Sequence, residues 1–130
     1  MTRYWITTHD PHEPDDKWYV YLKSDTRKKG VPARGDKILF YETAGKGKTG
    51  ASALVCMADV IGEIPEERRP PKGKWAYQIA CSEPAVTARM PVKAADMLAL
   101  LKTKMPIHAF QGLKEINVDQ YNALRSLMGI

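Results

Sequence analysis

The chain has 130 residues, of which 44% are hydrophobic, and its formal net charge is +5. That length fits one domain, and that apolar content can fill a core without disulfides or a metal. The sequence contains no apolar run near the roughly 18 residues of a membrane-spanning helix, and its first residues lack the pattern of a signal peptide. We therefore expect one domain over residues 1–130, which is cytoplasmic, has no membrane partner, and is a monomer or a weak dimer.

The positive charge is concentrated in one segment. Residues 23–50 contain eight basic and three acidic side chains, which gives this segment alone a charge of +5. A localised basic field attracts polyanions and speeds their encounter with the protein. A solvated surface that only keeps the protein soluble has the same composition. The residues that we expect to contact phosphate are Lys28, Lys29, Arg34, Lys46 and Lys48.

The first half of the chain is typical of β-structure. Residues 4–8 are rich in aromatic and β-branched side chains and predict a strand, which an acidic, proline-containing loop follows over residues 9–16. Residues 18–22 are apolar but too short to assign. Residues 37–43 give the clearest strand, and residues 51–60 give another after a glycine-rich segment. We expect these last two strands to pair antiparallel.

Further short strands are predicted downstream. Residues 63–74 carry three prolines and several charges and predict a surface loop. Residues 75–81 alternate between apolar and polar side chains, which favours a strand, and residues 86–90 favour one more. Residues 107–112 could form a further short strand.

Two helices are predicted near the C-terminus. Residues 94–102 place apolar side chains at helical spacing. The last helix is expected to begin after Asn117, because Asn117 and Gln120 have the spacing of a capping box, and Gly129 can end it. A chain of mostly strands with few, short helices predicts a mixed α+β domain. Its expected core is a closed or nearly closed β-barrel of about five or six strands with flanking short helices.

Four segments of the chain together resemble the EVE family. The first two are Tyr4-Trp5-Ile6 and Gly35-Asp36-Lys37-Ile38-Leu39-Phe40-Tyr41, which matches the family's "GD", three apolar positions and a tyrosine. The other two are Ala58-Asp59-Val60 before a proline-bearing loop, and Phe110-Gln111-Gly112 leading to Ile116-Asn117-Val118-Asp119-Gln120-Tyr121. No single motif is specific, and the resemblance depends on their order over nearly the whole chain. It implies the PUA-like fold that EVE domains share with the YTH readers of methylated RNA.

This resemblance suggests an aromatic pocket for a base. Trp18 and Trp75 each follow a lysine in a polar stretch, and the resemblance places them near the two cage residues of PUA-like readers. It places Tyr41 at the same rim, and Thr7 and Thr8 where related folds hydrogen-bond a base edge. A flipped base stacks on an aromatic ring with about 1–3 kcal/mol, and an apolar cage can prefer a methylated base.

The alternative interpretation is that these aromatic side chains fill the barrel interior. We expect this for Trp5, which lies in the middle of a predicted strand, because large aromatic residues dominate cores. Cys56 and Cys81 lie in apolar runs and are expected to behave as small hydrophobic residues.

Enzymatic and metal sites have little support in the sequence. Residues 9–16 hold two histidines and four carboxylates, but their spacing matches no metal-ligand motif. Residues 45–50 lack the full phosphate-loop pattern and precede a strand instead of a helix. His108 lies in an apolar stretch, and no catalytic triad is recognisable from spacing. We therefore expect no catalytic residues, no metal and no cofactor.

Two functions remain open from the sequence. The first is a binding module, not an enzyme, that accommodates an unpaired or modified base of DNA or RNA in an aromatic pocket. The second is a small-molecule-binding or catalytic domain on the same barrel, with the acidic loop over residues 9–16 as its polar wall. The sequence does not distinguish DNA from RNA, and it does not identify the base or any effector partner.

Overall fold

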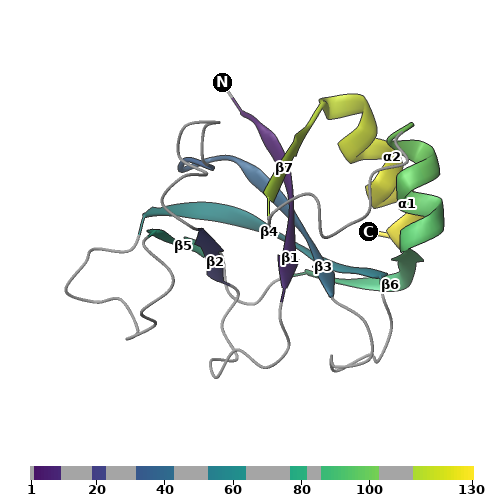
Figure 1. Cartoon of the computed structure of the whole chain (residues 1–130), viewed down its shortest axis with the longest axis horizontal. Coiled ribbons are helices and arrows are strands. Elements are labelled where there is room, and N and C mark those ends of the chain that lie inside the picture. The colour runs from purple at the N-terminus through teal and green to yellow at the C-terminus, as the bar shows by residue number, and fades with distance from the viewer. Residues whose placement is uncertain are drawn as a thin grey trace.

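The structure is a computed structural model that describes residues 2–9, 19–22, 32–42, 53–63, 77–81, 86–102 and 113–130. These segments form seven strands and two helices (Figure 1). The strands are β1 (Tyr4–His9), β2 (Tyr19–Leu22), β3 (Lys37–Glu42), β4 (Ala53–Glu63), β5 (Tyr77–Cys81), β6 (Val86–Lys93) and β7 (Leu113–Ile116). The helices are α1 (Ala94–Leu100) and α2 (Val118–Met128).

The strands form one mixed sheet in the order β2-β5-β4-β3-β1-β7. The neighbours β1 and β3 are parallel, and Tyr4 pairs with Lys37 at the start of both. All other neighbours are antiparallel. The predicted antiparallel pairing of residues 37–43 with 51–60 is confirmed, because Leu39 pairs with Met57 in the β3–β4 ladder.

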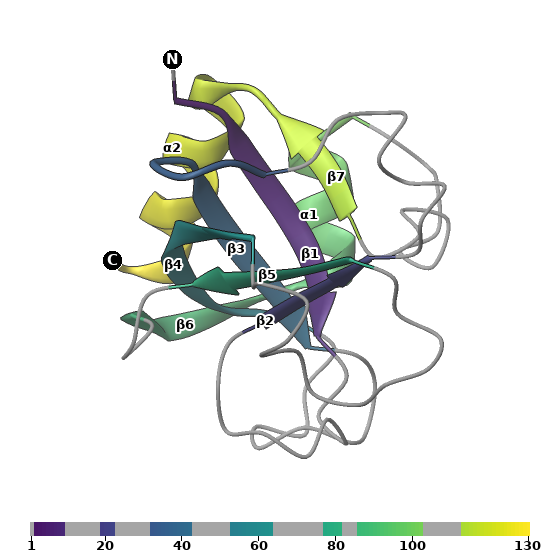
Figure 2. The ribbon, with the colours of Figure 1, turned by 90° about the vertical axis from the view of Figure 1, so that its left-hand side faces the viewer.

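Strand β4 is the longest, and two strands share one of its edges. Met57 pairs with Val86 of β6, whereas Val60 pairs with Cys81 of β5. Strands β5 and β6 therefore follow each other along β4 and act as one interrupted strand. The ladder of β4 with β5 and the ladder of β4 with β6 each contain a register shift. Such shifts bend a strand and increase its twist. Figure 2 shows the result, since β5 and β6 cross the direction of β1 and β3.

The α+β class is correct, but the predicted closed barrel is wrong. The ladder is an open path from β2 to β7, and these two end strands share no pairing in the described part of the chain. The reason lies in the shared edge of β4. Strand β6 extends that edge beside β5 and does not bridge the gap between β2 and β7. The seven strands also slightly exceed the expected five or six.

Two hydrophobic clusters lie on opposite faces of the sheet, because successive strand side chains alternate. The first contains Ile6, Leu39, Leu54 and the helical residues Met97 and Leu124. It is the face that α1 and α2 cover together (Figures 1 and 2). The second contains Trp5, Ile38, Phe40, Cys56, Ala58, Val60 and Cys81. Trp5 is 2% exposed, which confirms its expected core position.

Most predicted elements are present with shifted bounds. Residues 18–22, which the sequence left unassigned, supply β2, and β5 begins two residues later than expected. Strand β6 continues through Pro91 to Lys93, and α1 begins at the next residue, Ala94. The possible strand at residues 107–112 lies outside the described residues, and β7 follows it at residues 113–116.

The capping of α2 matches its prediction. The Asn117 side chain accepts a hydrogen bond from the backbone N–H of Gln120, and the Gln120 side chain accepts one from the backbone N–H of Asn117. Gly129 ends the helix in the left-handed conformation, at φ 74°. The ring centroids of Tyr121 and Tyr4 lie 4.7 Å apart, so α2 packs directly on β1. Neither of the two described helices is long and apolar enough to cross a membrane.

Candidate nucleic-acid interface

The parallel pair β1–β3 gives the sheet two distinct ends. Tyr4 and Lys37 pair at the start of both strands, and Thr8 pairs with Tyr41 near their far end. Four strand steps separate Lys37 from Tyr41, which corresponds to about 13 Å at roughly 3.3 Å per residue. The predicted site residues divide between these two ends.

The far end contains three of the five predicted pocket residues. Thr8 and Tyr41 are direct neighbours in the ladder. Tyr41 is 4% exposed and belongs to the hydrophobic cluster under the helices. Thr7 is 2% exposed and pairs with Phe40, which belongs to the cluster on the opposite face. Thr7 and Tyr41 therefore lie at the same end of the sheet but on opposite faces.

The two tryptophans predicted to form the cage, Trp18 and Trp75, lie outside the described residues. The strands that follow them are described. Tyr19 opens β2 opposite Ala80, and Tyr77 opens β5 opposite Leu22. The strands are antiparallel, so these starting points lie at opposite ends of a short ladder, about 10 Å apart.

Of the predicted phosphate-contacting residues, only Arg34 is described. Lys28, Lys29, Lys46 and Lys48 lie outside the described residues. Arg34 is exposed in the turn that precedes β3. This turn is at the start of β1 and β3, so Arg34 lies at the opposite end of the sheet from Tyr41.

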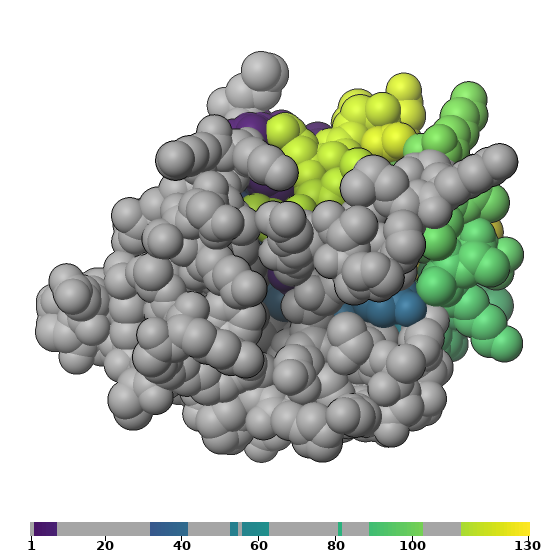
Figure 3. Space-filling model, in the orientation of Figure 1, coloured from purple at the N-terminus to yellow at the C-terminus, as the bar shows by residue number. Residues whose placement is uncertain are grey.

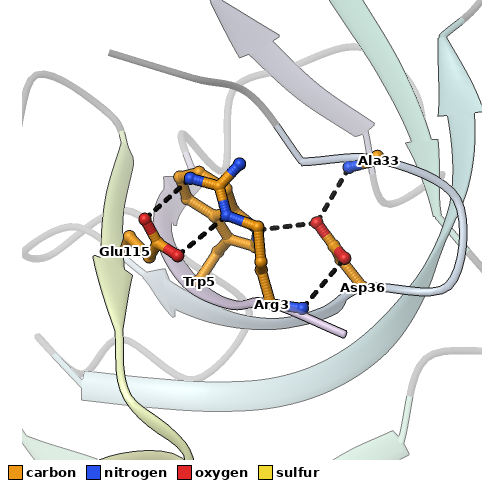
Figure 4. A network of polar contacts seen from close by, with 5 residues as sticks. All are labelled: Arg3, Trp5, Ala33, Asp36 and Glu115. Atoms are coloured by element: carbon orange, nitrogen blue, oxygen red, sulfur yellow. Dashed lines mark hydrogen bonds and ion pairs between the residues drawn. The ribbon is translucent and has the colours of Figure 1, made fainter. Parts of the chain in front are cut away.

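A buried carboxylate organises the turn that carries Arg34 (Figure 4). Asp36 is 3% exposed and accepts three hydrogen bonds. They come from the backbone N–H of Arg3 at 3.0 Å, from the Trp5 indole Nε1 at 3.0 Å, and from the backbone N–H of Ala33 at 2.9 Å. Gly35, at φ 93°, supplies the left-handed conformation that closes the turn. The "GD" dipeptide therefore fixes β1, the Trp5 indole and the Arg34 turn to one another.

The Arg3 side chain lies directly over the buried Trp5 ring. Its Cζ is 4.6 Å from the ring centroid. Its Nε and Nη2 donate to the two carboxylate oxygens of Glu115 on β7, at 2.8 and 2.7 Å. This hydrogen-bonded pairing raises the pKa of Arg3 and lowers the pKa of Glu115 below its usual value. Both side chains keep substantial exposure, at 40% and 45%.

A second ion pair lies beside this arrangement. Lys37 of β3 pairs with Asp59 of β4, its ladder partner. Among the residues that the structure describes, no group of three or more His, Cys, Asp or Glu side chains could hold a metal ion.

The sequence did not identify Arg3, Asp36 and Glu115 as a cluster. Asp36 had a signal, since "GD" directly before a strand marks a turn with a carboxylate available to cap backbone N–H groups. The contact between Arg3 and Glu115 joins residues 112 positions apart. No local pattern could have indicated it.

No family model matches the chain. No curated protein matches it significantly either. Solved structures do show the same fold over nearly the whole chain. One is a protein from Agrobacterium tumefaciens, with 18% identity, a TM-score of 0.61, and coverage of 98% of this chain and 94% of that one.

Two further neighbours have descriptive names. The crystal structure of ASCH from Zymomonas mobilis has 10% identity and a TM-score of 0.62, and covers 95% of this chain and 94% of that one. The Mmi1 YTH domain, solved in complex with RNA, has 12% identity and a TM-score of 0.64, and covers 98% of this chain and 78% of that one. The chain therefore has the same fold as these YTH and ASCH structures.

Proposed function

We propose that this domain binds single-stranded RNA and accommodates an unpaired or modified base in an aromatic pocket, without catalysing a reaction. The observation that carries the proposal is the structural similarity, over 98% of the chain, to a YTH domain solved in complex with RNA. We further infer that the chain belongs to the EVE branch of PUA-like domains, from the order of its sequence motifs. The proposal assigns the chain no cofactor.

The pocket that we propose lies at the far end of β1 and β3. Trp18 and Trp75 form its stacking walls, and Tyr41 and Thr8, neighbours in the ladder, form its edge. Thr7 supports the same strand end from the opposite face of the sheet. Base stacking on an aromatic ring tolerates any base, so selectivity depends on the polar groups and on the pocket size.

The phosphate backbone is proposed to follow the basic segment. Lys28, Lys29, Lys46 and Lys48 would supply positive charge from this segment, and exposed Arg34 supplies it at the start of β3. Phosphate contacts of this kind position the strand and provide affinity without reading sequence.

Two tryptophan variants test the pocket. We expect Trp75→Ala to lower the affinity for single-stranded RNA by about 1–3 kcal/mol, the contribution of one stacked base, while the protein stays folded. We expect Trp5→Ala to lower the free energy of unfolding by about 3–5 kcal/mol, because the Trp5 side chain is buried. Thermal melts and binding titrations with modified and unmodified RNA, and with DNA of the same sequence, measure both effects.

The outcomes separate recognition from packing. If Trp75→Ala unfolds the domain while the remaining folded protein binds RNA normally, Trp75 is a core residue and the pocket is wrong. If the wild-type protein binds no polynucleotide at low salt, the proposed function itself is wrong. Stronger binding of DNA than of RNA would mean that the ligand is DNA, and the proposed pocket would still hold.

A further inference from the structure

The guanidinium group of Arg3 is held on one face and along one edge. The covered face rests on Trp5, whose ring is 2% exposed. One edge is held by the two hydrogen bonds to Glu115. The side chain as a whole nevertheless remains 40% exposed, and the guanidinium face away from Trp5 contacts neither Trp5 nor Glu115. Figure 4 shows Arg3 held between Glu115 on one side and the Asp36 turn on the other.

This geometry holds a planar cation in place before any ligand arrives. An exposed arginine ordinarily loses side-chain entropy when it stacks on a ligand. Here Trp5 and Glu115 fix its plane, and Trp5 is itself fixed by the hydrogen bond to Asp36. Fixing a binding group in its bound conformation lowers that cost of binding.

We propose that Arg3 and Trp5, with Glu115, form a stacking platform for a second base of the bound RNA, distinct from the pocket at the far end of β1. This inference rests on the proposed function. The ligand at the platform is a flat nucleobase, which stacks on the outer face of the Arg3 guanidinium.

The charges favour a base over a phosphate at this position. The Glu115 carboxylate largely neutralises Arg3 and would repel a phosphate oxygen placed beside it. A base carries no net charge, and guanidinium planes stack bases in single-stranded RNA. The Glu115 oxygens can also accept a hydrogen bond from the amino group of a stacked base.

The flanking phosphate has a separate partner at the same end of the sheet. Arg34 is exposed, and its turn is bonded to the same Asp36 carboxylate that holds the backbone of Arg3. One buried carboxylate therefore sets the relative position of the platform and of the Arg34 turn. The start of β1 and the end of β7 are neighbours, since Tyr4 pairs with Ile116, and Figure 3 shows purple and yellow-green atoms side by side at the surface of the molecule.

The test compares a short and a longer single-stranded RNA that share the same central base. The short RNA, of about four nucleotides, is designed for the pocket, and the longer RNA, of about twelve, is designed to reach the platform as well. Arg3→Lys retains the charge and an ion pair with Glu115 but removes the flat surface. Arg89→Lys makes the same change at an exposed arginine on β6 and serves as the matched control.

We expect Arg3→Lys to weaken binding of the longer RNA by about 5- to 150-fold, the effect of removing one stacked base, and to leave the short RNA unaffected. Arg89→Lys should change neither. In NMR titrations of the wild-type protein, the Arg3 Nε–H signal should shift with the longer RNA only. Urea unfolding of each variant checks whether the fold is retained.

Each result has one meaning. If the wild-type protein binds both RNAs and Arg3→Lys binds the longer one equally well, the platform is wrong and the pocket stands. If Arg3→Lys weakens both RNAs alike, the substitution acts through the pocket or the fold, and the platform is again wrong. If the wild-type protein binds neither RNA, the proposed function fails and the platform fails with it.

Discussion

The indole N–H of Trp5 donates to Oδ2 of Asp36 across 3.0 Å, and both side chains are almost fully buried. Because Asp36 also accepts from two backbone N–H groups, its removal leaves three donors without their partner. A buried donor that loses its acceptor costs about 1–3 kcal/mol. We expect Asp36→Ala to lower the free energy of unfolding by about 3 kcal/mol or more, measured by urea denaturation at neutral pH.

The matched variant is Asp36→Asn, which keeps the shape and one carbonyl acceptor. It should destabilise the protein less than Asp36→Ala, because its carbonyl oxygen in the place of Oδ2 keeps the Trp5 indole and the Ala33 backbone N–H bonded. Equal, small effects of both substitutions would show that the carboxylate does not fix the turn.

The buried thiol of Cys81 makes stability depend on alkaline pH. Burial raises the pKa of Cys81 from its ordinary value near 9 to about 12. Between these values the unfolded chain loses the proton and the folded chain keeps it, so unfolding is favoured as pH rises. We expect the stability from this group to be complete below about pH 9 and to fall by up to about 1.4 kcal/mol per pH unit above it.

Denaturant curves at several pH values, for the wild type and for Cys81→Ala, measure that decline. The variant should show a smaller decline through the window, since other groups titrate equally in both proteins. The folded wild-type protein should also resist alkylation at Cys81 near pH 8, because the thiolate is the reactive species. Rapid modification of Cys81 in the folded protein would contradict its assigned burial.

The capping box of α2 should contribute measurably to stability. Asn117→Ala removes the side-chain acceptor for the Gln120 backbone N–H, which costs about 1 kcal/mol for a helix N-cap. The helix carries Tyr121, Leu124 and Met128 into the core, so the effect should appear in global unfolding. A double-mutant cycle with Gln120→Ala should show coupling, because the two side chains bond reciprocally. Independent effects would mean that the two bonds do not act together.

The basic segment should determine how RNA binding depends on salt. Replacing Lys28, Lys29 and Lys46 with glutamine removes three positive charges from residues 23–50. If each lysine neutralises one phosphate of single-stranded RNA, the slope of log K against log salt should decrease by about 0.7 for every lysine replaced. Titrations at several salt concentrations measure the slope. An unchanged slope would show that these lysines only keep the protein soluble.

The sheet was predictable where the sequence carries a strong local pattern. Residues 38–41 alternate between the two hydrophobic clusters, so the strand that contains them and its pairing with β4 could both be anticipated. The caps of α2 were equally accessible, because Asn117, Gln120 and Gly129 occupy fixed positions relative to the helix.

Closure of the sheet and the composition of the Arg3 cluster were not predictable. The open path depends on β5 and β6 sharing one edge of β4, a choice that no short segment encodes. The burial of Tyr41 depends on helical residues more than 50 positions further along the chain, so its motif could not indicate it. Arg3 was assigned no role, since its partner Glu115 lies in the last quarter of the chain. Long-range packing decides each of these positions.

The irregular course of β6 has a consequence for the protein at high concentration. Thr87 and Val92 of β6 lie five residues apart, whereas their partners on β4, Cys56 and Leu54, lie only two residues apart. The extra residues include Met90, at 60% exposed, and Pro91, which has no N–H to offer. A foreign chain that approached this edge would meet a bulge and a missing donor, and both hinder amyloid-like stacking. The irregularity within β6 thereby protects this edge of the sheet against aggregation.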